Sequence, residues 1–153
     1  MDEPSSSTMQ RILDILNIAN AGDRRRAREE FAALWSILPA HGDPVDSCTL
    51  AHLMADVQDD PSSELVWDQR ALEIADRLTP SDREQWPESA DKIAGFYPSL
   101  YLNLAVDYLK LNDRALASDY LSKAQECAHL LPDSDYGTMI RDGITWVESR
   151  LSA

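Results

Sequence analysis

The sequence predicts an all-α, single-domain protein built as a stack of antiparallel helix pairs. In the clearest segment, residues 99–124, large apolar residues recur at helical spacing on both sides of a turn at Asn112-Asp113. Such a segment is typical of two amphipathic helices packed against each other. Only five of the 153 residues are glycine, which is few for a sheet-rich fold, and 44% are hydrophobic, which suffices for one core.

The first pair of helices is expected between residues 8 and 41. Apolar residues recur at helical spacing from Met9 to Ala19, and Gly22-Asp23 then interrupts the pattern. Asp23 is placed to cap a second helix, which ends before Pro39 because proline cannot continue a helix. The apolar face of this second helix consists of Ala27, Phe31, Leu34, Trp35 and Leu38.

A second pair is expected between residues 45 and 78, with Asp59-Asp60-Pro61 as the turn between its helices. The segment 79–97 that follows is rich in helix breakers and charge, yet it contains Trp86 and Phe96. A disordered linker does not need such residues. We therefore expect an ordered insertion, with a short helix packed on the helix pairs.

The third pair is expected at 98–132 and a last helix at 136–152. Between them, Asp135 is able to cap the last helix and Gly137 is able to adopt a positive φ. The last helix carries one apolar face formed by Ile140, Ile144, Val147 and Leu151. This face predicts a capping helix that covers the open end of the stack.

The order of residues in these pairs resembles the tetratricopeptide repeat. In the third pair the pattern is carried by Tyr101, Leu104, Ala105, Tyr108, Leu111, Ala117, Leu121 and Ala124. In the first pair it is carried by the Gly22-Asp23 turn, the second helix and Pro39. The second pair departs from it, because Glu64 stands where alanine is usual and Asp68 where an aromatic residue is usual. The resemblance implies a superhelical stack of about three repeats that binds other proteins and is not an enzyme.

In such a stack the first helix of each pair lines a concave face. Carried over position by position, the residues of this face are Ile12, Leu16, Asn20, Thr49, Leu53, Asp56, Ser99, Leu102, Asn103, Val106 and Lys110. The face is apolar and partly acidic, so we expect it to bind a helix or peptide of a partner protein that carries apolar and basic side chains.

Two alternatives remain open. Leu102, Val106 and Leu109 could belong to the core, covered by the insertion through Trp86 and Phe96. The chain could also be a structural protein that forms a homo-oligomer, because Trp146 lies off the main apolar face of the last helix.

Composition excludes other classes of partner. The formal net charge of −13 repels a phosphate backbone, so we expect no nucleic acid partner. No apolar segment is long enough to span a membrane, and polar and acidic residues follow Met1 where a signal peptide would have basic and apolar ones. We therefore expect a cytoplasmic protein without a membrane partner.

The densest basic segment is Arg24, Arg25, Arg26 and Arg28, at the start of the second helix. Cations at this end oppose the helix dipole. We expect the nearby carboxylates of Asp23, Glu29 and Glu30 to neutralise them, which leaves a solvated face rather than a site for an acidic partner.

Few residues indicate catalysis or metal binding. The sequence has no phosphate-binding glycine loop, no His-Glu-x-x-His motif and no nucleophile elbow. Cys48 with His52, and Cys127 with His129, would offer zinc ligands, but residues two apart on a helix point in different directions. We expect no metal, no cofactor and no enzymatic activity. An enzyme would require a spatial convergence such as that of Asp107 with His52.

Overall fold

The computed structural model describes residues 4–153, without the side chains of residues 4–6, and every regular element in this range is a helix. The helices are α1 (Pro4–Asn20), α2 (Arg24–Ile37), α3 (Pro44–Asp56), α4 (Pro61–Asp76), α5 (Pro80–Gln85), α6 (Pro87–Ala94), α7 (Tyr97–Lys110), α8 (Arg114–Glu126) and α9 (Asp135–Ser152), with a 3₁₀ turn at Ala128–Leu130. The predicted all-α class is confirmed.

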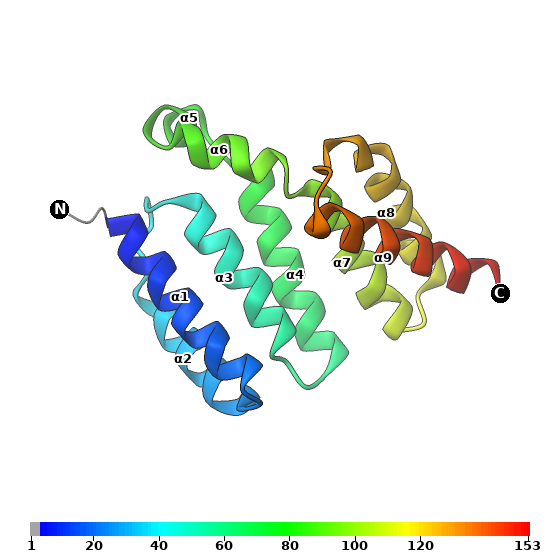
Figure 1. Ribbon diagram of the computed structural model, residues 1–153, viewed down its shortest axis with the longest axis horizontal. Coiled ribbons are helices and arrows are strands. Elements are labelled where there is room, and N and C mark those ends of the chain that lie inside the picture. Colours follow the sequence, from blue (N-terminus) through cyan, green and yellow to red (C-terminus); the bar gives the residue numbers. More distant parts are fainter. Residues whose placement is uncertain (1–3) are drawn as a thin grey trace.

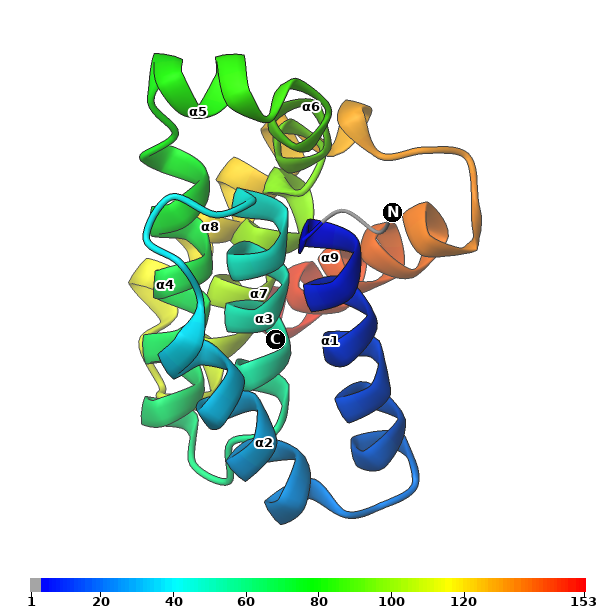
Figure 2. The ribbon, with the colours of Figure 1, turned by 90° about the vertical axis from the view of Figure 1, so that its left-hand side faces the viewer.

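Consecutive helices form three pairs that follow one another across the molecule (Figure 1). α1 packs on α2, α3 on α4, and α7 on α8. Between the pairs, α3 contacts α1 and α2, and α4 contacts α7. Figure 2 shows α4 and α8 on one side of the molecule and α1 and α9 on the other, with α3 and α7 between them. This order of contacts is compatible with the predicted stack.

The turns within the first and third pairs are built alike. Gly22 and Asn112 both have a positive φ, of 101° and 61°, which glycine adopts freely and asparagine tolerates. The next residue, Asp23 or Asp113, then caps the following helix by accepting a hydrogen bond from a backbone N–H three residues on. The predicted cap at Asp23 is confirmed.

The insertion 79–97 forms two short helices, α5 and α6. Thr79 and Asp82 cap α5 reciprocally through side-chain to backbone hydrogen bonds. α6 packs on α3 and buries Ser89, Ala90 and Ile93. The insertion is thereby joined to the second pair of helices.

The last helix covers the third pair. Leu102 is only 6% exposed and shares a cluster with Leu121 and Ile144, against which Val106 and Leu109 also pack. Leu102 is therefore a core residue. The element that covers it is α9, which packs on both α7 and α8, and not the insertion that the sequence suggested.

The start of α9 corrects the expectation for its cap. Ser134, not Asp135, accepts the hydrogen bond from the backbone N–H of Gly137. Gly137 does not have a positive φ. It is needed for space, because a Cβ at this position would lie 1.9 Å from the carbonyl oxygen of Pro132.

Candidate functional site

Three carboxyl groups meet in the core where α4 packs on α7. Glu64 and Asp68 lie one turn apart on α4, and Asp107 comes from α7. One oxygen of each lies within 4.8 Å of the others. Asp68 is 4% exposed and Asp107 1%, whereas Glu64 is half-buried. We call these three residues the carboxylate cluster.

Polar side chains surround the carboxylate cluster. Lys110 Nζ lies 2.9 and 3.1 Å from the two carboxylate oxygens of Glu64. His52 Nδ1 lies 3.9 Å from Asp68 Oδ1 and 2.9 Å from Asn103 Nδ2, and its Nε2 lies 3.8 Å from Asp56 Oδ2. Helices α3, α4 and α7 all contribute to this arrangement.

Burial decides the protonation of the carboxylate cluster. Both oxygens of Asp107 are buried and receive no hydrogen bond from a donor group among the described residues. This burial, the hydrogen bonds that protonated Asp107 makes with Asp68 and Glu64, and the negative charges of those two residues raise the pKa of Asp107 far above its ordinary value. Asp107 therefore holds a proton at neutral pH unless a cation takes its place.

The imidazole of His52 is under two opposing influences. Burial lowers its pKa, but the hydrogen bond with Asp68 and the charges of Asp56 and Asp68 outweigh burial, so its pKa is raised overall. When His52 is neutral, a hydrogen bond donated by the Asn103 amide to Nδ1 leaves the ring proton on Nε2, facing Asp56.

The predicted concave face is distributed over several environments. Ile12 is fully buried and Leu102 nearly so, and neither is accessible to a partner. Half-buried positions are Leu16, Thr49, Leu53, Ser99, Asn103 and Val106, and the exposed ones are Asn20, Asp56 and Lys110. Of the eleven residues, the structure brings Asp56, Asn103 and Lys110 together around His52 and Glu64.

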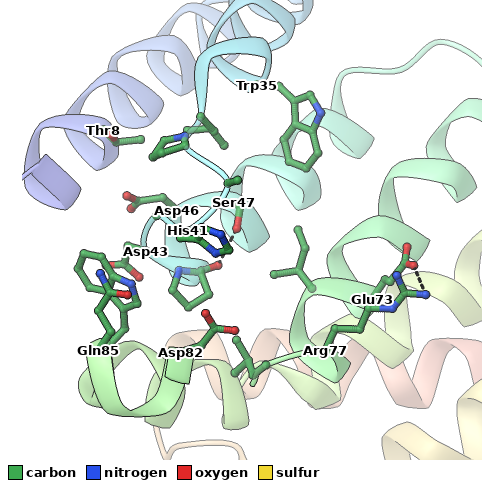
Figure 3. A pocket seen from close by; sticks show the side chains of 18 of the residues that line it. Thr8, Trp35, His41, Asp43, Asp46, Ser47, Glu73, Arg77, Asp82 and Gln85 are labelled. Carbon is green, nitrogen blue, oxygen red and sulfur yellow. Dashed lines mark hydrogen bonds and ion pairs between the residues drawn. The ribbon is translucent and has the colours of Figure 1, made fainter. Parts of the chain in front are cut away.

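A separate cavity of about 1060 Å³ lies between the α2–α3 connection, the end of α4, and α5 (Figure 3). Its apolar lining includes Trp35, Leu38, Ile74, Leu78 and Trp86. Carboxylates line it at Asp43, Asp46 and Asp82, with His41 nearby. Figure 3 shows these polar residues approaching the hollow from the start of α3 and from α5.

The charges around the cavity are not balanced. Arg77 is engaged with Glu73, with 2.7 Å between Nη2 and Oε1, and the guanidinium of Arg70 stacks over the Trp67 ring at 4.3 Å. Burial, and secondarily the charge of Asp43, raises the pKa of Asp46 to about 7. The Trp86 indole N–H is itself buried and has no hydrogen-bond partner among the described residues. The cavity therefore offers apolar surface and carboxylates.

The basic segment at the start of α2 is neutralised in a way only partly predicted. Arg25 pairs with Glu29 and Arg26 with Glu30, as expected from their spacing. Arg28 reaches Asp59 at 2.9 Å, and Arg24 donates to the carbonyl oxygen of Gln58. These two arginines attach α2 to the α3–α4 turn, a contact that the local sequence does not indicate.

The cysteines take no part in a candidate metal site. The thiol of Cys48 is buried and donates to the carbonyl oxygen of Ala71 at 3.5 Å. Within the described part of the chain, the group of His, Cys, Asp and Glu side chains close enough to hold a metal ion is the carboxylate cluster. His52 converges on Asp68, beside Asp107.

Sequence reasoning missed both arrangements, although a signal existed for one. Glu64 and Asp68 are the two departures from the repeat pattern in the second pair, and they mark the carboxylate cluster. Nothing local marks the cavity, because four segments distant in sequence form it.

No family model matches the chain, and no curated protein or solved structure is significantly similar to it. The resemblance to the tetratricopeptide repeat therefore stays a prediction from the sequence. None of the described helices is both long and apolar enough to cross a membrane.

Proposed function

We propose that this protein is a non-enzymatic binding module that recognises a segment of another protein carrying apolar and basic side chains. The observation that carries the proposal is the composition of the cavity. Trp35, Ile74 and Trp86 offer apolar contact area, and carboxylates stand beside them. A segment with an aromatic or aliphatic side chain next to lysine or arginine is complementary to both.

Charge supports the same kind of partner. The net charge of −13 attracts basic segments at long range, and it suppresses binding of acidic ones. Inside the cavity, the nearby cations of Arg70 and Arg77 are engaged with Trp67 and Glu73. Asp43 and Asp82 each accept a backbone hydrogen bond through one oxygen, and their second oxygens can accept from a cation of the partner.

The test uses two substitutions on α3 that add the same charge in different places. Ser47 lines the cavity, and Thr49 belongs to the face predicted from the sequence; both are half-buried. Binding peptides are first selected from a random displayed library against the wild-type protein. We expect Ser47→Arg, whose cation occupies the cavity, to weaken selected peptides at least about tenfold, a change of roughly 1.4 kcal/mol in binding free energy.

Thr49→Arg is the matched control and is expected to leave affinity within about twofold. Selected sequences should pair lysine or arginine with leucine or aromatic residues. A library without binders, or binders unaffected by Ser47→Arg, would contradict the proposal. If Thr49→Arg alone weakened peptide binding, the binding site would lie on the face of α1, α3 and α7 and not in the cavity.

A second candidate function is self-association through α9. Tyr136, Met139 and Trp146 are 41%, 60% and 47% exposed. At 100° per residue they fall within about 80° of one another around the helix axis. An exposed apolar stripe of this kind suits contact with an identical helix of a second copy.

A further inference from the structure

The carboxylate cluster has the donor set of a cation site. Glu64 and Asp68 project from one face of α4, and Asp107 projects from the facing helix α7. Carboxylates on facing helices are a recurring way to hold metal ions inside helical folds. Oxygen donors favour cations such as Ca²⁺, Mg²⁺ and Mn²⁺ over softer metals.

The spacing of the oxygens fits one ion. The three ligand oxygens lie within 4.8 Å of one another. Since Ca²⁺–oxygen bonds are 2.3–2.6 Å long, oxygens on opposite sides of one Ca²⁺ stand up to about 5 Å apart. A single ion can therefore contact all three groups with small side-chain movements.

Asp107 supplies an independent indication that something is bound here. The residue is 1% exposed, it reaches into the carboxylate cluster, and neither of its oxygens receives a hydrogen bond from a donor group among the described residues. A buried carboxylate without donors is costly, and native proteins compensate such groups with a partner, a proton or an ion.

The charges favour a divalent ion. When the cation has displaced the proton of Asp107, the three carboxylates carry three negative charges, and Lys110, which is bound to Glu64, supplies one positive charge. Two negative charges remain when His52 is neutral, and one divalent cation neutralises them. The half-buried Glu64 and the exposed Lys110 lie on the solvent side, which gives an ion a route to the buried carboxylates.

We propose that Glu64, Asp68 and Asp107 bind one divalent cation of the oxygen-preferring class. The site joins α4 to α7, so the ion ties the second pair of helices to the third. Lys110 competes with the ion for Glu64. The site is separate from the cavity beside α5, and its test does not depend on the proposed function.

The test titrates Ca²⁺, Mg²⁺ and Mn²⁺ separately into chelator-treated, full-length protein by calorimetry, with thermal unfolding as a second readout. We expect one ion per chain and a rise in Tm with ion concentration. Asp107→Asn and Glu64→Gln should each weaken binding about 100-fold or more, because outer-shell changes alone cost 10- to 100-fold. Lys110→Met should tighten binding, because it removes the competing cation.

Asp119→Asn on α8 is the control for removing an exposed carboxylate and should leave affinity unchanged. Circular dichroism confirms that each variant is folded. If none of the three ions binds, or if Asp107→Asn and Glu64→Gln bind as well as the wild type, the proposal is overturned. In the first case a proton on Asp107, which can donate to Asp68 or Glu64, compensates the burial of Asp107 instead.

Discussion

Asp107 illustrates how one buried group couples stability to solution conditions. An aspartate in an unfolded chain ionises near pH 4, whereas the pKa of Asp107 in the folded protein is far higher because of burial and the charges of Asp68 and Glu64. A raised folded-state pKa means that the folded chain binds a proton which the unfolded chain releases. The contribution of Asp107 to stability is therefore complete below about pH 4 and falls as pH rises toward its folded-state pKa.

Asp107→Asn removes this dependence while it keeps the shape of the side chain. In the presence of chelator, we expect the variant to gain up to about 3 kcal/mol relative to wild type between pH 5.5 and 8, because a proton bound only by the folded wild type costs about 1.4 kcal/mol per pH unit. Urea unfolding of both proteins at the two pH values measures this difference, and other titrating groups largely cancel from it. Parallel pH dependence of the two proteins would show that Asp107 ionises normally.

At the scale of the helices, short capping and spacing signals set where each element begins. Asp23, Asp60 and Asp113 each accept backbone hydrogen bonds at the start of α2, α4 and α8. These signals are local, and the sequence predicts the cap at Asp23 and the turns that contain Asp60 and Asp113. The cap of α9 was assigned one residue late because two neighbouring polar residues, Ser134 and Asp135, both suit the position.

The two glycines of α9 are expected to respond differently to alanine. A Cβ at Gly137 would stand 1.9 Å from the carbonyl oxygen of Pro132. This clash can be relieved only by moving the backbone at Pro132, whose carbonyl oxygen accepts a hydrogen bond from Arg141. We expect Gly137→Ala to destabilise the protein by about 2–3 kcal/mol, the cost of overpacking. Thermal and urea unfolding measure the change.

Gly143→Ala is the matched substitution. Its Cβ would meet Leu102 Cδ2 at 2.6 Å, but this atom is the end of a side chain that can rotate. Alanine also gains up to about 1 kcal/mol of helix propensity over glycine. The net effect should lie within about 1 kcal/mol of zero, and equal losses at the two positions would refute the distinction between backbone and side-chain contacts.

At the scale of the whole molecule, the sequence predicts the helices better than the sites. Apolar spacing and the Gly22-Asp23 and Asn112-Asp113 turns are local patterns, and the helices follow them. The sites depend on which helices face each other. His52 meets Asn103, 51 residues away in sequence, and Arg28 meets Asp59 across a pair boundary. No periodicity encodes such pairings, whereas Glu64 and Asp68 depart from the repeat pattern and mark the carboxylate cluster.

The stripe on α9 bears on how whole molecules assemble. α9 is the last element, and its inner face packs on α7 and α8, while Tyr136, Met139 and Trp146 remain exposed. The cation of Arg150 lies 5.0 Å from the centre of the Trp146 ring and covers it only in part.

If α9 mediates self-association, light scattering after size exclusion should give twice the mass of one chain at concentrations on the order of 100 µM, a Kd range typical of small interfaces. Trp146→Glu should return the protein to one chain, because two glutamates would meet across a symmetric contact. Leu116→Glu on α8, which is 37% exposed, changes charge equally away from the stripe and should leave the mass doubled. A wild-type mass of one chain throughout would remove self-association as a function and leave partner binding as the role of the molecule.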